Sequence, residues 1–209
     1  MPKVTPQYEE ARKKSILEGA ASVFAREGYQ QTTIDEIAAA LKMSKGAIYL
    51  YFKNKEELYV SVLQAIYERR FAILSTAYET DDPITVKFEK IMDRLGSLMN
   101  HDDYVFIRLS LEGFLESEHM PKLHAIKTES HQHFYALINE LLQEGQRSGQ
   151  INPELNLPST IAIFMAVADG LMMHSLVEDW GINPDRVRQI FHDTFSQLIE
   201  NRPEASSPI

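Results

Sequence analysis

The chain has 209 residues, 44% hydrophobic and 24% charged, so it can bury a sizeable core and is not expected to be disordered. It contains no cysteine, which excludes a disulfide scaffold, a cysteine nucleophile and a cysteine-based zinc site. The net charge is −9, yet residues 1–55 carry nine Lys and Arg against six Asp and Glu. One interpretation is a basic N-terminal region that binds a polyanion, attached to an acidic remainder of the chain. The other is that the charges are unevenly distributed without a functional reason.

Helix signals follow one another along the first 55 residues. Pro6 opens a first helix and Gly28 ends it, since proline suits a helix start and glycine a helix end. Thr33 precedes a short helix, with Glu36 three residues later in a capping-box pattern. Ser44 is in position to cap another short helix. The first 55 residues are therefore predicted to form three helices.

The rest of the chain continues the helical pattern. Asn54 is expected to cap a helix over about residues 55–79, and Asn183 precedes a proline at a further helix start. Between them helical segments are predicted at 84–100, 103–117, 121–147, 158–180 and 184–200. No segment shows the sustained period-2 alternation typical of strands. The sequence predicts an all-α protein of about nine helices.

The two short helices between residues 33 and 52 match a helix-turn-helix. This motif needs small or aliphatic residues where its helices cross, and Ala38, Leu41 and Ile48 supply them. The connecting turn is tight at Lys42, where a glycine would reach a positive φ more easily. The pattern predicts that the second short helix enters the major groove of DNA.

The residues of that second helix suit a polyanion. Gly46 lacks a side chain, so the backbone can approach a duplex closely, and Lys45 can reach guanine acceptors or phosphate. The hydroxyls of Tyr49 and Tyr51 can donate to phosphate. A role in packing alone would leave Gly46 unexplained, because glycine inside a helix costs about 1 kcal/mol relative to alanine.

Three blocks carry a resemblance to a known family: Thr32–Ala38, Ser44–Tyr49 and Tyr51–Leu58. Together they resemble the N-terminal domain of the tetracycline-repressor (TetR) family, without a gap over about residues 12–60. The resemblance implies a homodimeric repressor that leaves a near-palindromic DNA operator when a small apolar or amphipathic effector binds. The implied DNA contacts are Thr33, Ser44, Lys45, Gly46, Ala47, Tyr49, Tyr51 and Lys55.

The resemblance also implies a division of the chain. Residues 1–55 would form the DNA-binding domain, residues 56–202 a helical ligand-binding and dimerisation domain, and residues 203–209 a flexible tail. No apolar segment follows the basic N-terminal residues, and the most apolar run, Ile161–Ala168, is shorter than a bilayer span. We therefore expect a cytoplasmic protein with no membrane partner.

Aromatic and methionine stripes in the body predict an effector cavity, because such side chains form adaptable apolar walls. Plain core packing is the alternative for each of them. Glu112 and Asp169 lie beside apolar runs, where a carboxylate can neutralise a cationic effector; Glu112 can instead pair with Arg108 four residues earlier. The candidate cavity residues are Phe88, Met92, Tyr104, Ile107, Leu111, Phe134, Phe164, Met165, Asp169 and Met172.

The last two helices carry an apolar face that predicts a dimer interface. A two-fold dimer holds two recognition helices about 34–36 Å apart, which matches successive major grooves. The alternative is that this face packs within its own subunit. The candidate interface residues are Leu176, Trp180, Phe191, Phe195 and Leu198.

Two other functional classes stay open: an all-α enzyme, and a helical interaction module that does not bind DNA. The chain lacks a P-loop, a GxGxxG motif, an HExxH motif and a GxSxG nucleophile elbow, so catalysis is not favoured and no cofactor is expected. Its Glu116-x-x-His119 pair lacks the second copy that a di-iron bundle requires, so no metal is expected.

Overall fold

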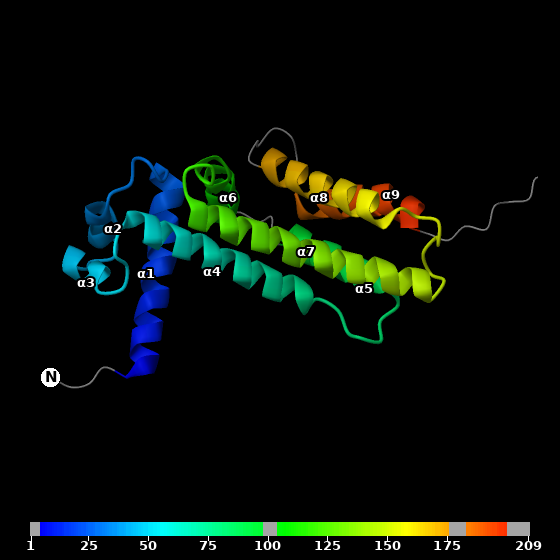
Figure 1. Ribbon diagram of the computed structural model, residues 1–209, viewed down its shortest axis with the longest axis horizontal. Helices are drawn as coiled ribbons and strands as arrows, with labels where there is room; N and C mark the ends of the chain where they lie inside the picture. The colour runs from blue at the N-terminus through cyan, green and yellow to red at the C-terminus, as the bar shows by residue number, and fades with distance from the viewer. Residues whose placement is uncertain (1–4, 98–103, 176–182, 200–209) are drawn as a thin grey trace, which may run out of the picture. The chain divides into compact units, whose positions relative to one another are not determined.

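The computed structural model describes residues 5–97, 104–175 and 183–199, and these ranges contain nine α-helices (Figure 1). The predicted all-α class is confirmed. The helices are α1 (Pro6–Glu27), α2 (Ile34–Ala40), α3 (Lys45–Tyr49), α4 (Lys55–Ser75), α5 (Ile84–Ser97), α6 (Tyr104–Glu116), α7 (Pro121–Arg147), α8 (Leu157–His174) and α9 (Pro184–Ile199).

Four of the nine described helices begin at a capping side chain that the sequence predicted. Asn54 Oδ1 accepts the Glu57 backbone N–H at 2.8 Å before α4, and Asn183 Oδ1 accepts the Arg186 backbone N–H at 2.9 Å before α9. Helix ends were predicted less well. α4 ends at Ser75, four residues before its predicted end, and there the hydroxyls of Ser75 and Thr76 both donate to the Ala72 carbonyl oxygen.

The chain divides into two compact units. Unit 1 comprises Met1–Arg69 and Asp102–Thr128, and unit 2 comprises Arg70–His101 and Glu129–Ile209. α6 belongs with the N-terminal helices because it packs on α1. These units reflect packing, so they do not test the predicted functional boundary at residue 55.

The core of unit 1 is built around three aromatic rings. Phe24, Tyr29 and Tyr59 lie with ring centroids 4.5–6.1 Å apart, and Ile37 and Ile48 of the helix-turn-helix are fully buried in the same cluster. Burial raises the pKa of Tyr59 far above its ordinary value, so its hydroxyl keeps its proton and donates to the Leu109 carbonyl oxygen. α2 and α3 are therefore anchored on α1 and α4 through buried apolar contacts.

The core of unit 2 centres on Phe164 of α8. Its ring centroid lies 5.0 Å from that of Phe191 and 5.1 Å from that of Phe195, both on α9. Phe191 and Phe195 are 1% and 3% exposed. Their prediction as dimer-interface residues is wrong, because side chains buried within one subunit cannot offer surface to another.

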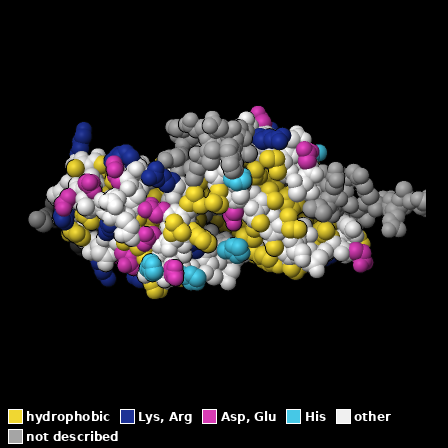
Figure 2. Space-filling view, turned by 90° about the horizontal axis from the view of Figure 1, so that it is seen from above, with side chains coloured by type: hydrophobic (Ala, Val, Ile, Leu, Met, Phe, Trp, Pro, Cys, Tyr) yellow, Lys and Arg dark blue, Asp and Glu magenta, His cyan; other side chains and the backbone are white. Residues whose placement is uncertain are grey.

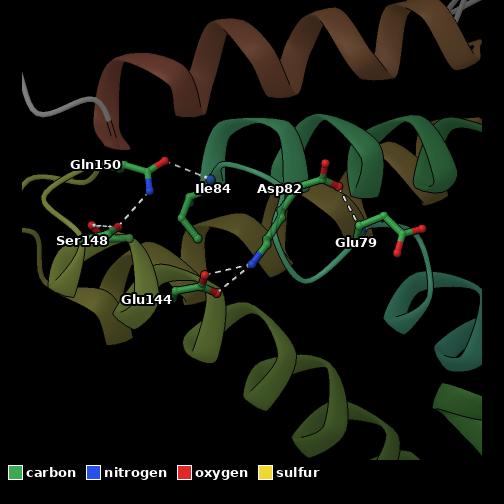
Figure 3. A network of polar contacts seen from close by, with 8 residues as sticks. Glu79, Asp82, Ile84, Glu144, Ser148 and Gln150 are labelled. Atoms are coloured by element: carbon green, nitrogen blue, oxygen red, sulfur yellow. Dashed lines mark hydrogen bonds and ion pairs between the residues drawn. The ribbon is translucent and has the colours of Figure 1, made fainter.

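A buried cation joins α5 to the end of α7 (Figure 3). The Lys87 side chain is 3% exposed, and its ammonium donates to both carboxylate oxygens of Glu144, at 2.8 and 3.0 Å. Nearby, the Ile84 backbone N–H donates to Gln150 Oε1 at 3.0 Å. The Lys87 ammonium also lies 5.6 Å from the Tyr78 ring centroid. These contacts satisfy a charge that would otherwise be costly to bury.

α8 is long and apolar enough, by length and composition alone, to cross a membrane, whereas the run Ile161–Ala168 within it is shorter than a bilayer span. Thr160, Ile161, Phe164 and Leu171 of this helix are buried in unit 2. Because one side of α8 supplies core residues, its length and composition are weak evidence for a membrane span.

Candidate functional site

The helix-turn-helix is held by the capping bonds that the sequence predicted. Thr33 Oγ1 accepts the Glu36 backbone N–H at 3.2 Å, and the Glu36 carboxylate accepts the Thr33 backbone N–H at 2.7 Å. Ser44 Oγ accepts the Ala47 backbone N–H at 3.2 Å. These bonds satisfy amides that a helix start leaves without partners. The capping oxygens of Thr33 and Ser44 act as acceptors, and phosphate contacts at these residues stay a prediction.

The turn between α2 and α3 forms without a glycine. Lys42 has a φ of 52°, in the left-handed region where non-glycine residues cost about 1–2 kcal/mol. The turn is closed by the Met43 backbone N–H, which donates to the Ala38 carbonyl oxygen at 2.9 Å. Buried Ala38 and Ile48 hold the two helices across it. Burial on both sides of the turn thus offsets the strain at Lys42.

α3 presents an exposed face outside the core. Ser44, Lys45 and Gly46 are exposed, and Tyr49 is 44% exposed. A Cβ at Gly46 would have Ser44 Oγ as its nearest neighbour outside the adjoining residues, 4.0 Å away. No packing contact among the described residues therefore requires glycine at position 46.

Leu50 also belongs to this exposed region, although it was not among the predicted contacts. It is 82% exposed at the end of α3. The sequence contained a signal, because Leu50 follows buried Ile48 by two residues, which places the two side chains on opposite sides of a helical turn. Tyr51 instead packs partly against the unit 1 core, and Ala47 is half-buried.

Charged side chains of both signs lie close together over unit 1 (Figure 2). Lys45 is the first residue of α3, and its ammonium donates to Asp35 Oδ2 of α2 at 2.7 Å. This bond to Asp35 raises the pKa of Lys45, so the ammonium stays charged at neutral pH. The predicted base-reading lysine is thus paired with a carboxylate on the neighbouring helix.

Lys55 binds the loop between α1 and α2, a structural role that the sequence did not indicate. Its ammonium donates to the carbonyl oxygens of Tyr29, Gln30 and Thr32, at 2.7, 3.3 and 2.9 Å, and lies 4.4 Å from the Tyr29 ring centroid. These contacts fasten the loop between α1 and α2 to the start of α4. The ammonium's donors are occupied within the chain, so we no longer count Lys55 among the expected phosphate contacts.

Glu112 of α6 holds the same loop from another side. Its Oε1 accepts the Tyr29 backbone N–H at 2.6 Å, while its Oε2 is buried without a hydrogen-bond partner among the described residues. Glu116, one turn later, accepts a bond from the Gln30 side-chain amide at 2.9 Å. Two α6 carboxylates thereby position the segment that leads into the helix-turn-helix.

Burial dominates the electrostatics of Glu112 and raises its pKa, against the lowering effect of the Tyr29 bond. The folded state therefore holds the proton more tightly than the unfolded state, so this group contributes stability at low pH that is lost as pH rises through the folded-state pKa. In the Glu112→Gln variant, the side-chain amide at this position does not titrate. We expect the stability of the wild type relative to this variant to decrease between pH 4.5 and pH 7, which urea unfolding at several pH values measures. A difference that is constant or grows with pH would contradict this.

The predicted cavity residues divide between the two units. Unit 2 has a groove of about 540 Å³ between α5 and α9. Phe88, Met92 and Phe164, all predicted cavity residues, line it. The groove also carries charged residues, among them Glu89 and Arg188.

The other predicted cavity residues do not line this groove. Ile107 and Leu111 lie in unit 1, whereas Phe134 and Met165 pack in the core of unit 2. Asp169 is exposed, Met172 is half-buried, and the side chain of Tyr104 lies outside the described residues. Of the predicted interface residues, Leu176 and Trp180 lie outside the described residues, as does the side chain of Leu198. Their roles stay predictions.

Comparisons with known proteins place the helix-turn-helix and the body in one family. Residues 16–62 match the model of bacterial regulatory proteins of the tetR family, and residues 99–200 match the C-terminal model of BetI-type transcriptional repressors. The chain belongs to the TetR family. Since relatives in this family are transcriptional regulators, the chain is a helix-turn-helix regulator of transcription rather than an enzyme.

Individual relatives are also helix-turn-helix transcriptional regulators by name. The regulator YuxN of Bacillus subtilis is 36% identical over 105 residues, which is 50% of this chain and 36% of YuxN. The regulator YfiR of the same organism is 23% identical over 178 residues, which is 85% of this chain and 86% of YfiR. A Saccharomonospora viridis protein classed as a transcriptional regulator, solved with choline, has a TM-score of 0.80 at 24% identity, covering 93% of this chain and 100% of that one. That similarity shows the TetR-like fold.

Proposed function

We propose that this chain is a cytoplasmic, homodimeric repressor that binds a near-palindromic operator through α3 and is released by a small apolar or amphipathic effector. The observation that carries the DNA contact is the exposed face of α3 around Gly46. A glycine with open space around it weakens a helix without improving its packing, and close approach of a duplex backbone explains it. In this proposal residues 1–55 bind DNA, and residues 56–202 bind effector and partner.

Gly46→Ala tests this interpretation with two opposite effects. Alanine is the better helix former, so we expect the variant to be more stable by up to about 1 kcal/mol. The added methyl group should nonetheless keep α3 from its place in the groove and weaken operator binding by about tenfold or more. Thermal unfolding and titration of a labelled operator measure the two effects. An increase in stability with unchanged DNA affinity would show that this surface does not meet DNA.

The operator itself can be found by selecting bound duplexes from a random double-stranded library. The proposal expects the purified protein to enrich two similar half-sites related by two-fold symmetry, centred about 34–36 Å apart or a multiple of this. Failure to enrich any sequence at low salt would refute the proposed function.

An exposed apolar face of α8 supports the homodimer. Ile163 and Met173 are 48% and 50% exposed, and Ala162, Ala166 and Gly170 recur every fourth residue on the same side of the helix. On the face of the molecule drawn in Figure 2, hydrophobic side chains gather near the middle of the view. Such a patch on a folded domain is typical of a subunit interface. Sedimentation equilibrium is expected to give twice the chain mass, and a monomer at micromolar concentration would contradict the dimer.

The groove between α5 and α9 is our candidate effector site. Its lining combines aromatic and charged residues, which suits an amphipathic molecule, and its volume of about 540 Å³ falls in the range of ligand sites, roughly 300–1,000 Å³. The Saccharomonospora viridis protein of similar fold was solved with choline, which supports a small-molecule effector here. Such an effector acts only if it binds the DNA-free conformation more tightly than the DNA-bound one.

A further inference from the structure

The ion pair between Lys45 and Asp35 connects the two helices of the helix-turn-helix at its exposed surface. The two atoms are 2.7 Å apart, and the side chains of Lys45 and Asp35 are 48% and 67% exposed. Exposed pairs of this kind contribute little to stability. The N-terminus of α2 is capped by Thr33 and Glu36, so Asp35 is not required for capping. The pair therefore calls for an explanation at the DNA surface.

A carboxylate beside a DNA-reading lysine changes what that lysine recognises. A free ammonium is attracted to any phosphate and to guanine N7 and O6. An ammonium bonded to Asp35 still has two N–H donors, but part of its charge is neutralised and its position is restrained. The carboxylate has a second oxygen, which can accept a bond from the amino group of cytosine or adenine.

We propose that Asp35 is a specificity-determining residue, which with Lys45 presents a joined donor and acceptor to the major groove and suppresses binding to unrelated DNA. The pair would favour a position where a base acceptor lies beside an amino group, as in adenine or across a G·C pair, over consecutive guanines. The inference rests on the proposed contact of α3 with DNA and adds Asp35 of α2 to the reading surface.

The test compares wild type, Asp35→Asn and Asp35→Ala in the same selection from a random duplex library. Glu18→Gln is the matched control, because it removes the same charge from another exposed ion pair, with Lys14 within α1. In the Asp35 variants we expect the preference to shift toward guanine at one position of each half-site, with the other positions unchanged. For each half-site, the ratio of operator affinity to random-duplex affinity should fall by about 5- to 150-fold, the usual discrimination of one good base contact.

Salt dependence supplies a second readout. Releasing Lys45 for phosphate should make the slope of log affinity against log salt for random DNA more negative by about one for each subunit. Glu18→Gln should change neither the preferred sequence nor this slope. An Asp35→Ala protein with the wild-type consensus and affinity ratio would overturn the inference while leaving the proposed function intact. A wild type that selects no sequence would overturn the proposed function first.

Discussion

Replacing both Lys45 and Tyr49 with alanine is expected to raise the dissociation constant for the operator by more than about 100-fold. One base-edge contact contributes about 1–3 kcal/mol, and a two-fold dimer loses each contact twice. Lys45 and Tyr49 are exposed and lie outside the buried core, so the variant should fold with wild-type helicity and stability. Fluorescence anisotropy with the selected operator measures the affinity, and circular dichroism measures the folding.

Lys14→Ala is the matched control for this prediction. Lys14 is an exposed lysine of α1 whose ammonium lies 3.9 Å from a Glu18 carboxylate oxygen, so its removal gives the same charge change on another helix. The control should keep operator affinity within about threefold, because it loses only a long-range attraction that salt screens. Equal losses in the control and the double variant would assign the effect to net charge. Unchanged binding by the double variant would remove α3 from the DNA interface.

Replacing Phe164 with alanine is expected to lower the free energy of unfolding by about 3–5 kcal/mol, the usual cost of emptying a buried aromatic site. Phe164 is 1% exposed, and its ring has four aromatic neighbours, on α5, α7 and α9, with centroids 5.0–6.1 Å away. The cavity would lie where three helices meet α8, so neighbouring rings have little freedom to fill it. Urea unfolding followed by far-ultraviolet circular dichroism measures the change.

The control for Phe164 is Leu115→Ala on α6, where the side chain is 73% exposed. This change should alter the free energy of unfolding by less than about 0.5 kcal/mol, since little buried area is lost. A small loss at Phe164 would show that the ring cluster is loosely packed. Because Phe164 also lines the groove, we expect Phe164→Ala to impair any effector response as well.

Local signals in the sequence determined much of this fold. The caps at Thr33, Ser44, Asn54 and Asn183 were predicted and found, because each joins a side chain to a backbone amide three residues away. The same local information predicted the helix-turn-helix and the exposure of Lys45, since they depend on spacing within about 20 residues. Family membership could be inferred from those same short blocks, which the comparisons confirmed.

Contacts between distant residues were decided only by the tertiary structure. Lys55 was predicted to meet phosphate, but its ammonium bonds to carbonyl groups more than 20 residues earlier. Glu112 reaches the Tyr29 amide across 83 positions, and Phe191 turned out to be core rather than interface. An apolar or charged residue has the same helical spacing whether it faces its own subunit, a partner or DNA. Which of these it meets depends on how the helices pack, and that is a property of the whole chain.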